Sequence, residues 1–156
     1  MKKTLLIIAA IFIATQLFSQ DVEKITITYN KIDLFYESGN INTLQLLNQQ
    51  PYEINVGPEQ CTRIIDIKNM QVTFYSDAVD TVYLDIVKYE KLDNGIFHIV
   101  CNERNILYPE EDNIRILTNT YVDIENNLSV YSYIWGDDQG QATFANKAIN
   151  PKIQIQ

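Results

Sequence analysis

The longest regular alternation in the sequence is N-I-R-I-L-T-N-T-Y-V-D-I-E, residues Asn113–Glu125. Apolar or β-branched residues occupy every second position from Ile114 to Ile124, and most of the positions between them are polar. Successive side chains of a β-strand point to opposite faces of a sheet, so this period of two predicts a strand with one buried face. The pair Asn126-Asn127 follows, and it predicts a tight turn because Asn tolerates positive φ.

The chain beyond this turn continues the same buried face. Tyr131, Tyr133 and Trp135 alternate onto the apolar face of the preceding strand. A second loop, at residues 137–140, returns the chain so that Phe144 adds to this face. The sequence therefore predicts three consecutive strands that build one apolar surface.

Two further hairpins are predicted nearer the N-terminus. Residues 68–69 are expected to form a two-residue turn, because this register leaves Ile65 and Val72 on the same face. Residues 93–95 are expected to close the next hairpin, with the glycine in the left-handed region. With this loop Ile86 falls on the polar face. The apolar face of that hairpin is expected to contain Tyr83, Val87, Tyr89, Phe97, Ile99 and Cys101.

Residues 21–60 carry a weaker pattern. The segment Lys24–Tyr29 is rich in β-branched residues and is interpreted as a strand, although apolar residues here also recur at helical spacing. The segment Asn42–Asn48 fits either a short helix capped by Asn42 or a further strand. The tail after Asn146 fits a last strand or a loose end.

Together these segments predict an all-β domain of about seven to nine antiparallel strands in meander order. Even spacing and tight turns are typical of an up-and-down barrel or of a curled two-sheet sandwich. This architecture resembles the calycin style. No sequence signature accompanies that likeness, so the fold by itself implies no function.

Residues 1–19 have the order of a bacterial-type signal peptide. A positive start at Lys2 and Lys3 precedes the apolar run Leu5–Ala14, and Ser19 is a small residue before an acidic chain. The apolar run is shorter than the roughly 20 residues that a spanning helix needs. An uncleaved membrane anchor is the alternative. Residues 20–156 are interpreted as a single β-rich domain of a periplasmic or secreted protein.

Composition and charge disfavour several classes of function. The 156 residues include 12 Lys and Arg against 20 Asp and Glu, so the formal charge is −8. Cleavage after Ser19 would remove two lysines and no acid, and a charge of −10 would remain. Nucleic-acid binding is not expected, because it requires a clustered basic face. The single histidine, His98, excludes a multi-histidine metal site, and no metal or serine-nucleophile motif is present. No catalytic residue, metal or cofactor is predicted.

Cys61 and Cys101 are an even pair in a chain expected to be exported, where disulfides persist. A bond between them would close a loop of about 40 residues and stabilise the fold by roughly 4 kcal/mol in the chain-entropy model. In the predicted meander they lie three strands apart, about 14 Å in a flat sheet, so a bond requires curling. The disulfide Cys61–Cys101 is therefore a hypothesis, and two buried free thiols are the alternative.

Tyr131, Tyr133 and Trp135 are the candidate binding residues. Aromatic rings with a polar tip are frequent in interfaces and binding sites, and the alternative is that these three belong to the core beside Phe144. The first hypothesis is an exported, non-catalytic binding protein with a protein partner, one form of which is an inhibitor of a basic protein. The second is a barrel that carries a small apolar ligand, and the third is a carboxylate-based hydrolase. No membrane contact is expected beyond the export signal.

Overall fold

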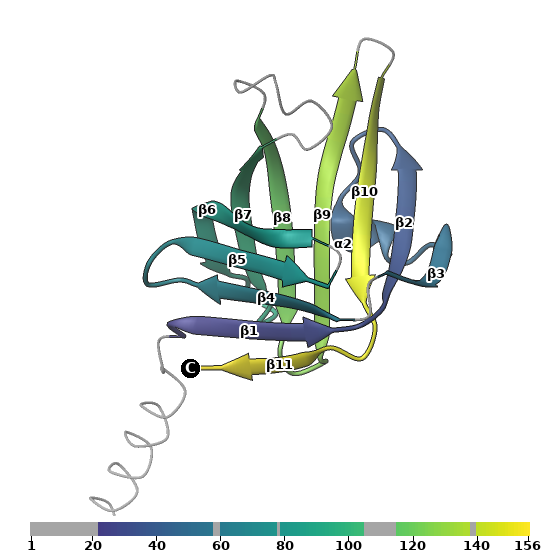
Figure 1. Ribbon diagram of the computed structural model, residues 1–156. Helices are drawn as coiled ribbons and strands as arrows, with labels where there is room; N and C mark the ends of the chain where they lie inside the picture. The colour runs from purple at the N-terminus through teal and green to yellow at the C-terminus, as the bar shows by residue number, and fades with distance from the viewer. Residues whose placement is uncertain (1–21, 58–59, 78, 105–114, 138–139) are drawn as a thin grey trace, which may run out of the picture.

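A computed structural model of the chain describes residues 22–57, 60–77, 79–104, 115–137 and 140–156 (Figure 1). The predicted signal peptide, residues 1–19, lies outside these residues. The described chain contains eleven strands and one short helix. The strands are β1 Lys24–Tyr29, β2 Ile32–Ser38, β3 Glu53–Val56, β4 Cys61–Asp66, β5 Gln71–Ser76, β6 Val79–Lys91, β7 Phe97–Arg104, β8 Arg115–Asp123, β9 Leu128–Asp137, β10 Gly140–Ala148 and β11 Lys152–Ile155, and the helix is α2 Thr43–Leu46.

All the strands belong to one antiparallel sheet with the order β11-β1-β4-β5-β6-β7-β8-β9-β10-β2-β3. Strands β4 to β10 follow one another in space as they do in the sequence, which confirms the all-β meander. The sheet is curled and not closed, with β11 and β3 at its edges. There are more strands than predicted, because β2, β3 and β11 join the sheet through partners that are distant in the sequence.

The main core lies between the two halves of the curled sheet. In Figure 1, β11, β1, β4 and β5 run across β7, β8 and β9. The inner faces of the two halves supply alternate side chains to one cluster, as period-two strands require. Its buried members are Ile25, Ile27, Ile65, Val72, Leu84, Ile86, Phe97, Ile99, Cys101 and Val122.

Helix α2 covers the other face of β2, β9 and β10. The Asn42 side chain caps it by accepting hydrogen bonds from the backbone N of Leu44 at 3.0 Å and of Gln45 at 3.3 Å. The hydroxyls of Thr43 and Ser132 are 2.7 Å apart, which ties the helix to β9. The helix interpretation of this segment is therefore the correct one. A second buried cluster joins the helix to the sheet and consists of Phe35, Leu46, Val130 and Ala145.

Two hairpins share one turn design, written in the sequence as Asp-Ile-x-Asn. Asp66 accepts hydrogen bonds from the backbone N and the side-chain Nδ2 of Asn69, both at 3.0 Å. Asp123 accepts the same two bonds from Asn126, at 3.0 and 2.7 Å. These bonds stabilise the charged carboxylates, so they hold the pKa of Asp66 and of Asp123 below the usual value.

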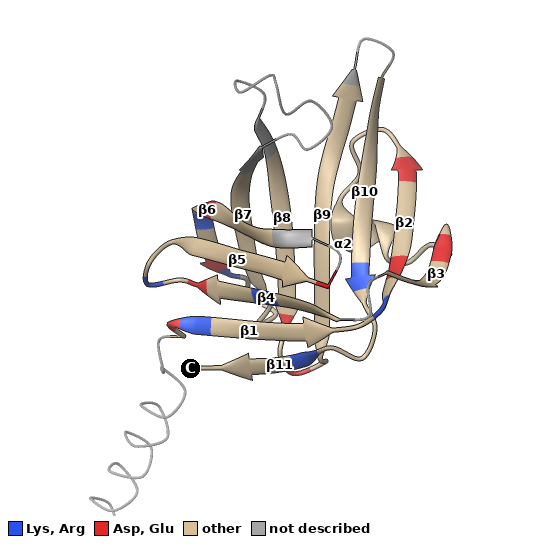
Figure 2. Ribbon diagram, viewed as in Figure 1, with Lys and Arg blue, Asp and Glu red and all other residues tan. Residues whose placement is uncertain are grey.

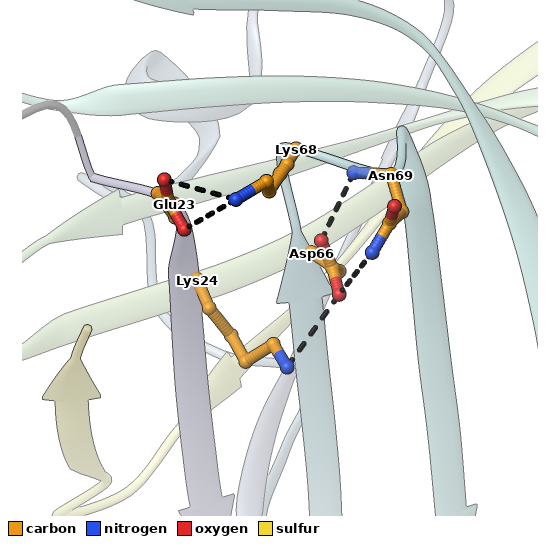
Figure 3. A network of polar contacts seen from close by, with 5 residues as sticks. All are labelled: Glu23, Lys24, Asp66, Lys68 and Asn69. Atoms are coloured by element: carbon orange, nitrogen blue, oxygen red, sulfur yellow. Dashed lines mark hydrogen bonds and ion pairs between the residues drawn. The ribbon is translucent and has the colours of Figure 1, made fainter.

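Ion pairs flank the first of these turns (Figure 3). Lys24 Nζ lies 3.5 Å from Asp66 Oδ2, and Lys68 Nζ lies 3.2 and 3.3 Å from the two carboxylate oxygens of Glu23. Exposed pairs of this kind contribute little stability individually. The hydrogen bonds between Asp66 and Asn69 therefore define the turn.

The hairpin registers follow the predictions, with one correction at a turn. Ile65 pairs with Val72, as predicted. The turn expected at residues 126–127 is a four-residue loop, because Asp123 pairs with Leu128. A shift of two positions leaves every side chain on the same face, so the predicted buried face is retained.

A β-bulge in β6 corrects the face predicted for part of that strand. The register shifts between Ile86 and Lys88, which leaves Val87 without a direct partner on β7. Ile86 is therefore 5% exposed and Val87 is 52% exposed, the reverse of the prediction. Tyr83, also predicted to face inward, is exposed for the same reason. An extra residue in one strand inverts the alternation beyond it.

Met70 occupies the left-handed region with φ 53°, at the turn position that Asn127 occupies in the second hairpin with φ 50°. An L-residue other than Gly, Asn or Asp loses roughly 1 kcal/mol there. Met70 is 43% exposed, so its replacement sacrifices little burial. We expect Met70→Asn to raise the free energy of unfolding by about 0.5–1 kcal/mol in urea denaturation. Asn127→Met is the matched control and should lower it by a similar amount; a loss of stability in Met70→Asn would contradict this account.

The two cysteines are buried free thiols, so the predicted disulfide is not formed. Cys61 pairs with Ser76, which pairs with Val79 of β6, whereas Cys101 pairs with Ile86 of β6. Strands β4 and β7 are three steps apart in the sheet order, and the two thiols are not bonded across the curled sheet.

Candidate functional site

An aromatic groove lies at β2, β9 and β10, on the inner face of the sheet. Its volume is about 480 Å³, within the range of roughly 300–1,000 Å³ that is typical of small-molecule sites. Five of its seven lining residues are aromatic, and one of these five, Phe35, packs its side chain under α2 on the other face of β2. The seven residues are Leu34, Phe35, Tyr36, Tyr52, Tyr133, Phe144 and Asn146.

Strand register brings three of these rings into one row. Tyr133 of β9 pairs with Phe144 of β10, which pairs with Tyr36 of β2. The Tyr133 and Phe144 ring centroids are 5.1 Å apart with planes at 11°, and those of Tyr36 and Phe144 are 5.1 Å apart with planes at 54°. Aromatic pairs attract one another at these separations. The row forms a continuous aromatic wall of the groove.

Tyr52 and Tyr36 add exposed rings to the groove. The backbone N of Tyr52 donates a hydrogen bond to the carbonyl oxygen of Leu34 at 2.7 Å, which fixes residue 52 beside β2. Exposed rings that adjoin a half-buried aromatic wall leave apolar surface in contact with water. A ligand that covers this surface gains the free energy of its burial.

The structure places the three predicted binding residues on one face of β9. Tyr133 lines the groove, and the Tyr131 ring lies next to it with a centroid separation of 6.0 Å. Trp135 pairs with Ala142 and is not among the groove residues. All three aromatic side chains are half-buried. Two of the three therefore lie in or beside the groove, and a binding role for them stays a prediction.

Reasoning from the sequence missed five groove residues: Leu34, Phe35, Tyr36, Tyr52 and Asn146. Leu34 and Tyr36 alternate with period two, which is the signal that could have identified β2. Their place in the groove depends on β10, where the partner of Tyr36 is Phe144, 108 positions later in the chain. A pattern of neighbouring residues in the sequence cannot predict the pairing of Tyr36 with Phe144.

A buried arginine lies beside Tyr131. Arg63, on the inner face of β4, is 7% exposed, and its Cζ lies 4.4 Å from the ring centroid of Tyr131 and 5.5 Å from that of Phe74. Its Nη1 donates a hydrogen bond to Thr120 Oγ1 at 2.9 Å. Within the described residues, its Nε has no hydrogen-bond partner and no carboxylate lies at ion-pair distance. Arg63 is two positions before Ile65, so the alternation of β4 places both side chains on the inner face. This was the signal in the sequence that could have identified a buried charge.

The buried polar groups next to Arg63 are neutral, and a carboxylate that acts on this cluster, that of Asp77, belongs to an exposed residue. The Cys61 thiol shares hydrogen bonds with the Tyr29 phenol and the Ser76 hydroxyl. Burial raises the pKa of the Cys61 thiol and of the Tyr29 phenol above their ordinary values, so both stay protonated at pH 7. Neither group balances the charge of Arg63.

His98 belongs to a separate network on the opposite face of β7 and β8. Its Nδ1 lies 2.9 Å from Glu90 Oε1 and its Nε2 lies 2.9 Å from Asn119 Oδ1. Its ring stacks on Tyr121 with a centroid separation of 4.5 Å. These contacts hold the imidazole in place between strands, and none of them involves a groove residue.

Comparisons of the chain with protein-family models, with curated proteins and with solved structures gave no match. No helix in the described ranges is long and apolar enough to cross a membrane. The groove and Arg63 are therefore the features of the described chain from which a function is inferred.

Proposed function

We propose that the chain is an exported, non-catalytic binding protein that holds a small, largely apolar ligand in the aromatic groove. The observation that carries the proposal is the groove itself, about 480 Å³ with a row of three contacting rings, Tyr133, Phe144 and Tyr36, along one wall. Concave, mostly apolar sites with a few polar groups are the usual form of small-molecule sites. Export is proposed from the pattern of residues 1–19.

The polar groups of the groove favour binding over catalysis. They are the phenol hydroxyls of its tyrosines and the amide of Asn146, which can orient a ligand by hydrogen bonds. None of its described lining residues is acidic, basic or a histidine. A hydrolase built on two carboxylates therefore finds no support here.

The proposal is tested with N-phenyl-1-naphthylamine, a neutral apolar dye whose fluorescence rises in apolar sites. We expect saturable binding to the full chain with one dye per molecule. Tyr133→Ala and Phe144→Ala should each weaken binding by about tenfold or more, because each removes a central ring from the aromatic wall.

Tyr83→Ala is the matched control, because Tyr83 is an exposed tyrosine on β6 outside the groove. It should leave the dissociation constant unchanged. Circular dichroism shows whether each variant is folded. Absence of saturable binding to the wild-type chain would refute the proposed function, as would equal effects of Tyr83→Ala and Phe144→Ala.

A basic protein is the second candidate partner. Carboxylates lie on both strands beside the groove, Asp33 and Glu37 on β2 and Glu53 on β3 (Figure 2), in a chain of formal charge −8. Such a surface attracts a positively charged partner. Native mass spectrometry of the protein purified from its own cells separates the candidates. A small added mass that is lost on denaturation supports the groove ligand, and a complex with a second polypeptide supports the protein partner.

A further inference from the structure

We propose that the groove ligand is an apolar carboxylate whose head group binds Arg63 and whose body lies among the groove rings. This inference rests on the proposed function and adds the chemical class of the ligand. It joins two features that are separate in the sequence, the buried arginine of β4 and the aromatic wall of β9, β10 and β2.

The first step is the incomplete environment of Arg63. A guanidinium remains charged at every physiological pH, and a buried charge normally has an oppositely charged partner. The rings of Tyr131 and Phe74 offset part of the burial cost through cation–π contacts. Within the described residues no carboxylate pairs with Arg63, and its Nε–H has no acceptor. A ligand carboxylate would supply both the negative charge and the missing acceptor.

The second step is the position of Arg63 relative to the groove. Thr120, Tyr131, Asn146 and Leu34 are direct neighbours on four adjacent strands, so they form one row across the inner face. Arg63 contacts the first two, and the last two line the groove. Adjacent strands are about 4.8 Å apart, so the guanidinium lies roughly 10 Å from the groove wall. One ligand with a polar head and an apolar body can span this distance.

The third step is the sign of the charge that the site accepts. Cys61 and Tyr29, which lie next to Arg63, are neutral at pH 7. Asp33 and Glu37 lie on the same face of β2 as Phe35, which packs against α2. Glu53 pairs with Leu34 at the β3 end of the groove, and the exposed Asp77 acts on Cys61. At the inner end of the site the buried charge is that of Arg63, so this end presents a positive charge to the ligand. It favours an anionic head over a neutral or cationic one.

The experiment compares three ten-carbon ligands by isothermal titration calorimetry: decanoate, decanol and decyltrimethylammonium. We expect the wild-type chain to bind decanoate roughly tenfold to a hundredfold more tightly than decanol, and the ammonium compound least. Arg63→Met keeps an apolar side chain of similar length and removes the charge. It should weaken decanoate binding until it equals decanol binding, while the affinity for decanol is unchanged. Arg63→Lys should retain part of the preference, because it keeps the charge and loses the planar guanidinium.

The outcomes separate this inference from the function on which it rests. Equal affinity of the wild-type chain for decanoate and decanol would overturn the role of Arg63 and leave the groove as an apolar site. An unchanged preference for decanoate in Arg63→Met would overturn it as well. Absence of binding by all three ligands and by N-phenyl-1-naphthylamine would overturn both proposals. If Arg63→Met does not fold, the role of Arg63 is tested by the relative affinities of the wild-type chain and of Arg63→Lys for decanoate and decanol.

Discussion

Leu46→Ala is expected to lower the free energy of unfolding by about 2–5 kcal/mol, the range for removing a fully buried leucine side chain. Leu46 is 0% exposed and packs with Phe35, Val130 and Ala145 between α2 and the sheet. A helix of one turn has little stability of its own, so this packing holds it in place. Urea denaturation followed by circular dichroism measures the change.

Leu44→Ala is the matched control, because Leu44 lies in the same helix, is half-buried and is outside the buried cluster. It should cost about 1 kcal/mol or less. Equal losses in the two variants would contradict the packing described for α2. Since the helix covers the reverse face of the strands that form the groove, the comparison also measures how firmly that part of the sheet is supported.

Thr143→Val is expected to destabilise the fold by about 2–4 kcal/mol, because it leaves two backbone groups without a partner. Thr143 is fully buried in β10. Its Oγ1 donates a hydrogen bond to the Gly39 carbonyl oxygen at 2.8 Å and accepts one from the Ile41 backbone N at 2.9 Å. These two bonds hold the loop that leads from β2 to α2. Valine has the same shape and lacks the hydroxyl.

Thr143→Ser is the control for this prediction, because it keeps the hydroxyl and removes one methyl group. It should cost about 1 kcal/mol, the value of a buried methyl. Denaturation in urea again provides the measurement. A larger loss in Thr143→Ser than in Thr143→Val would mean that packing, and not hydrogen bonding, makes this position important.

The faces of the meander strands were predictable because burial follows the period of the strand. Thr118, Thr120 and Val122 are buried on one side of β8, as the alternation predicted. The prediction failed at Val87, where the bulge in β6 inverts the pattern. The sequence contained a sign that the predicted register was wrong, because it placed the apolar residue Ile86 on the polar face. A bulge depends on how the neighbouring strands fit, so alternation alone does not locate it.

The sequence predicted the part of the candidate site that lies on β9 and β10, and it did not predict the part on β2 and beside it. Tyr133 and Phe144 belong to consecutive strands, so a local hairpin pattern was enough to place them together. Tyr36 and Tyr52 reach the groove through pairing of β2 with β10, which lies far away in the sequence. The disulfide hypothesis failed for a related reason, because the position of a cysteine along its strand depends on registers across several strands.

The local features of this protein follow from its sequence alone: the period-two strands, the meander from β4 to β10 and the Asp-Ile-x-Asn turns. Each of these depends on residues that are close in the chain, where alternation and turn preferences act directly. The pairing of β1 with β11, the addition of β2 and β3, the free cysteines and the place of Arg63 next to Tyr131 follow from the tertiary structure alone. These features depend on which distant strands meet, and that choice is set by burial over the whole sheet against the entropy of closing long loops.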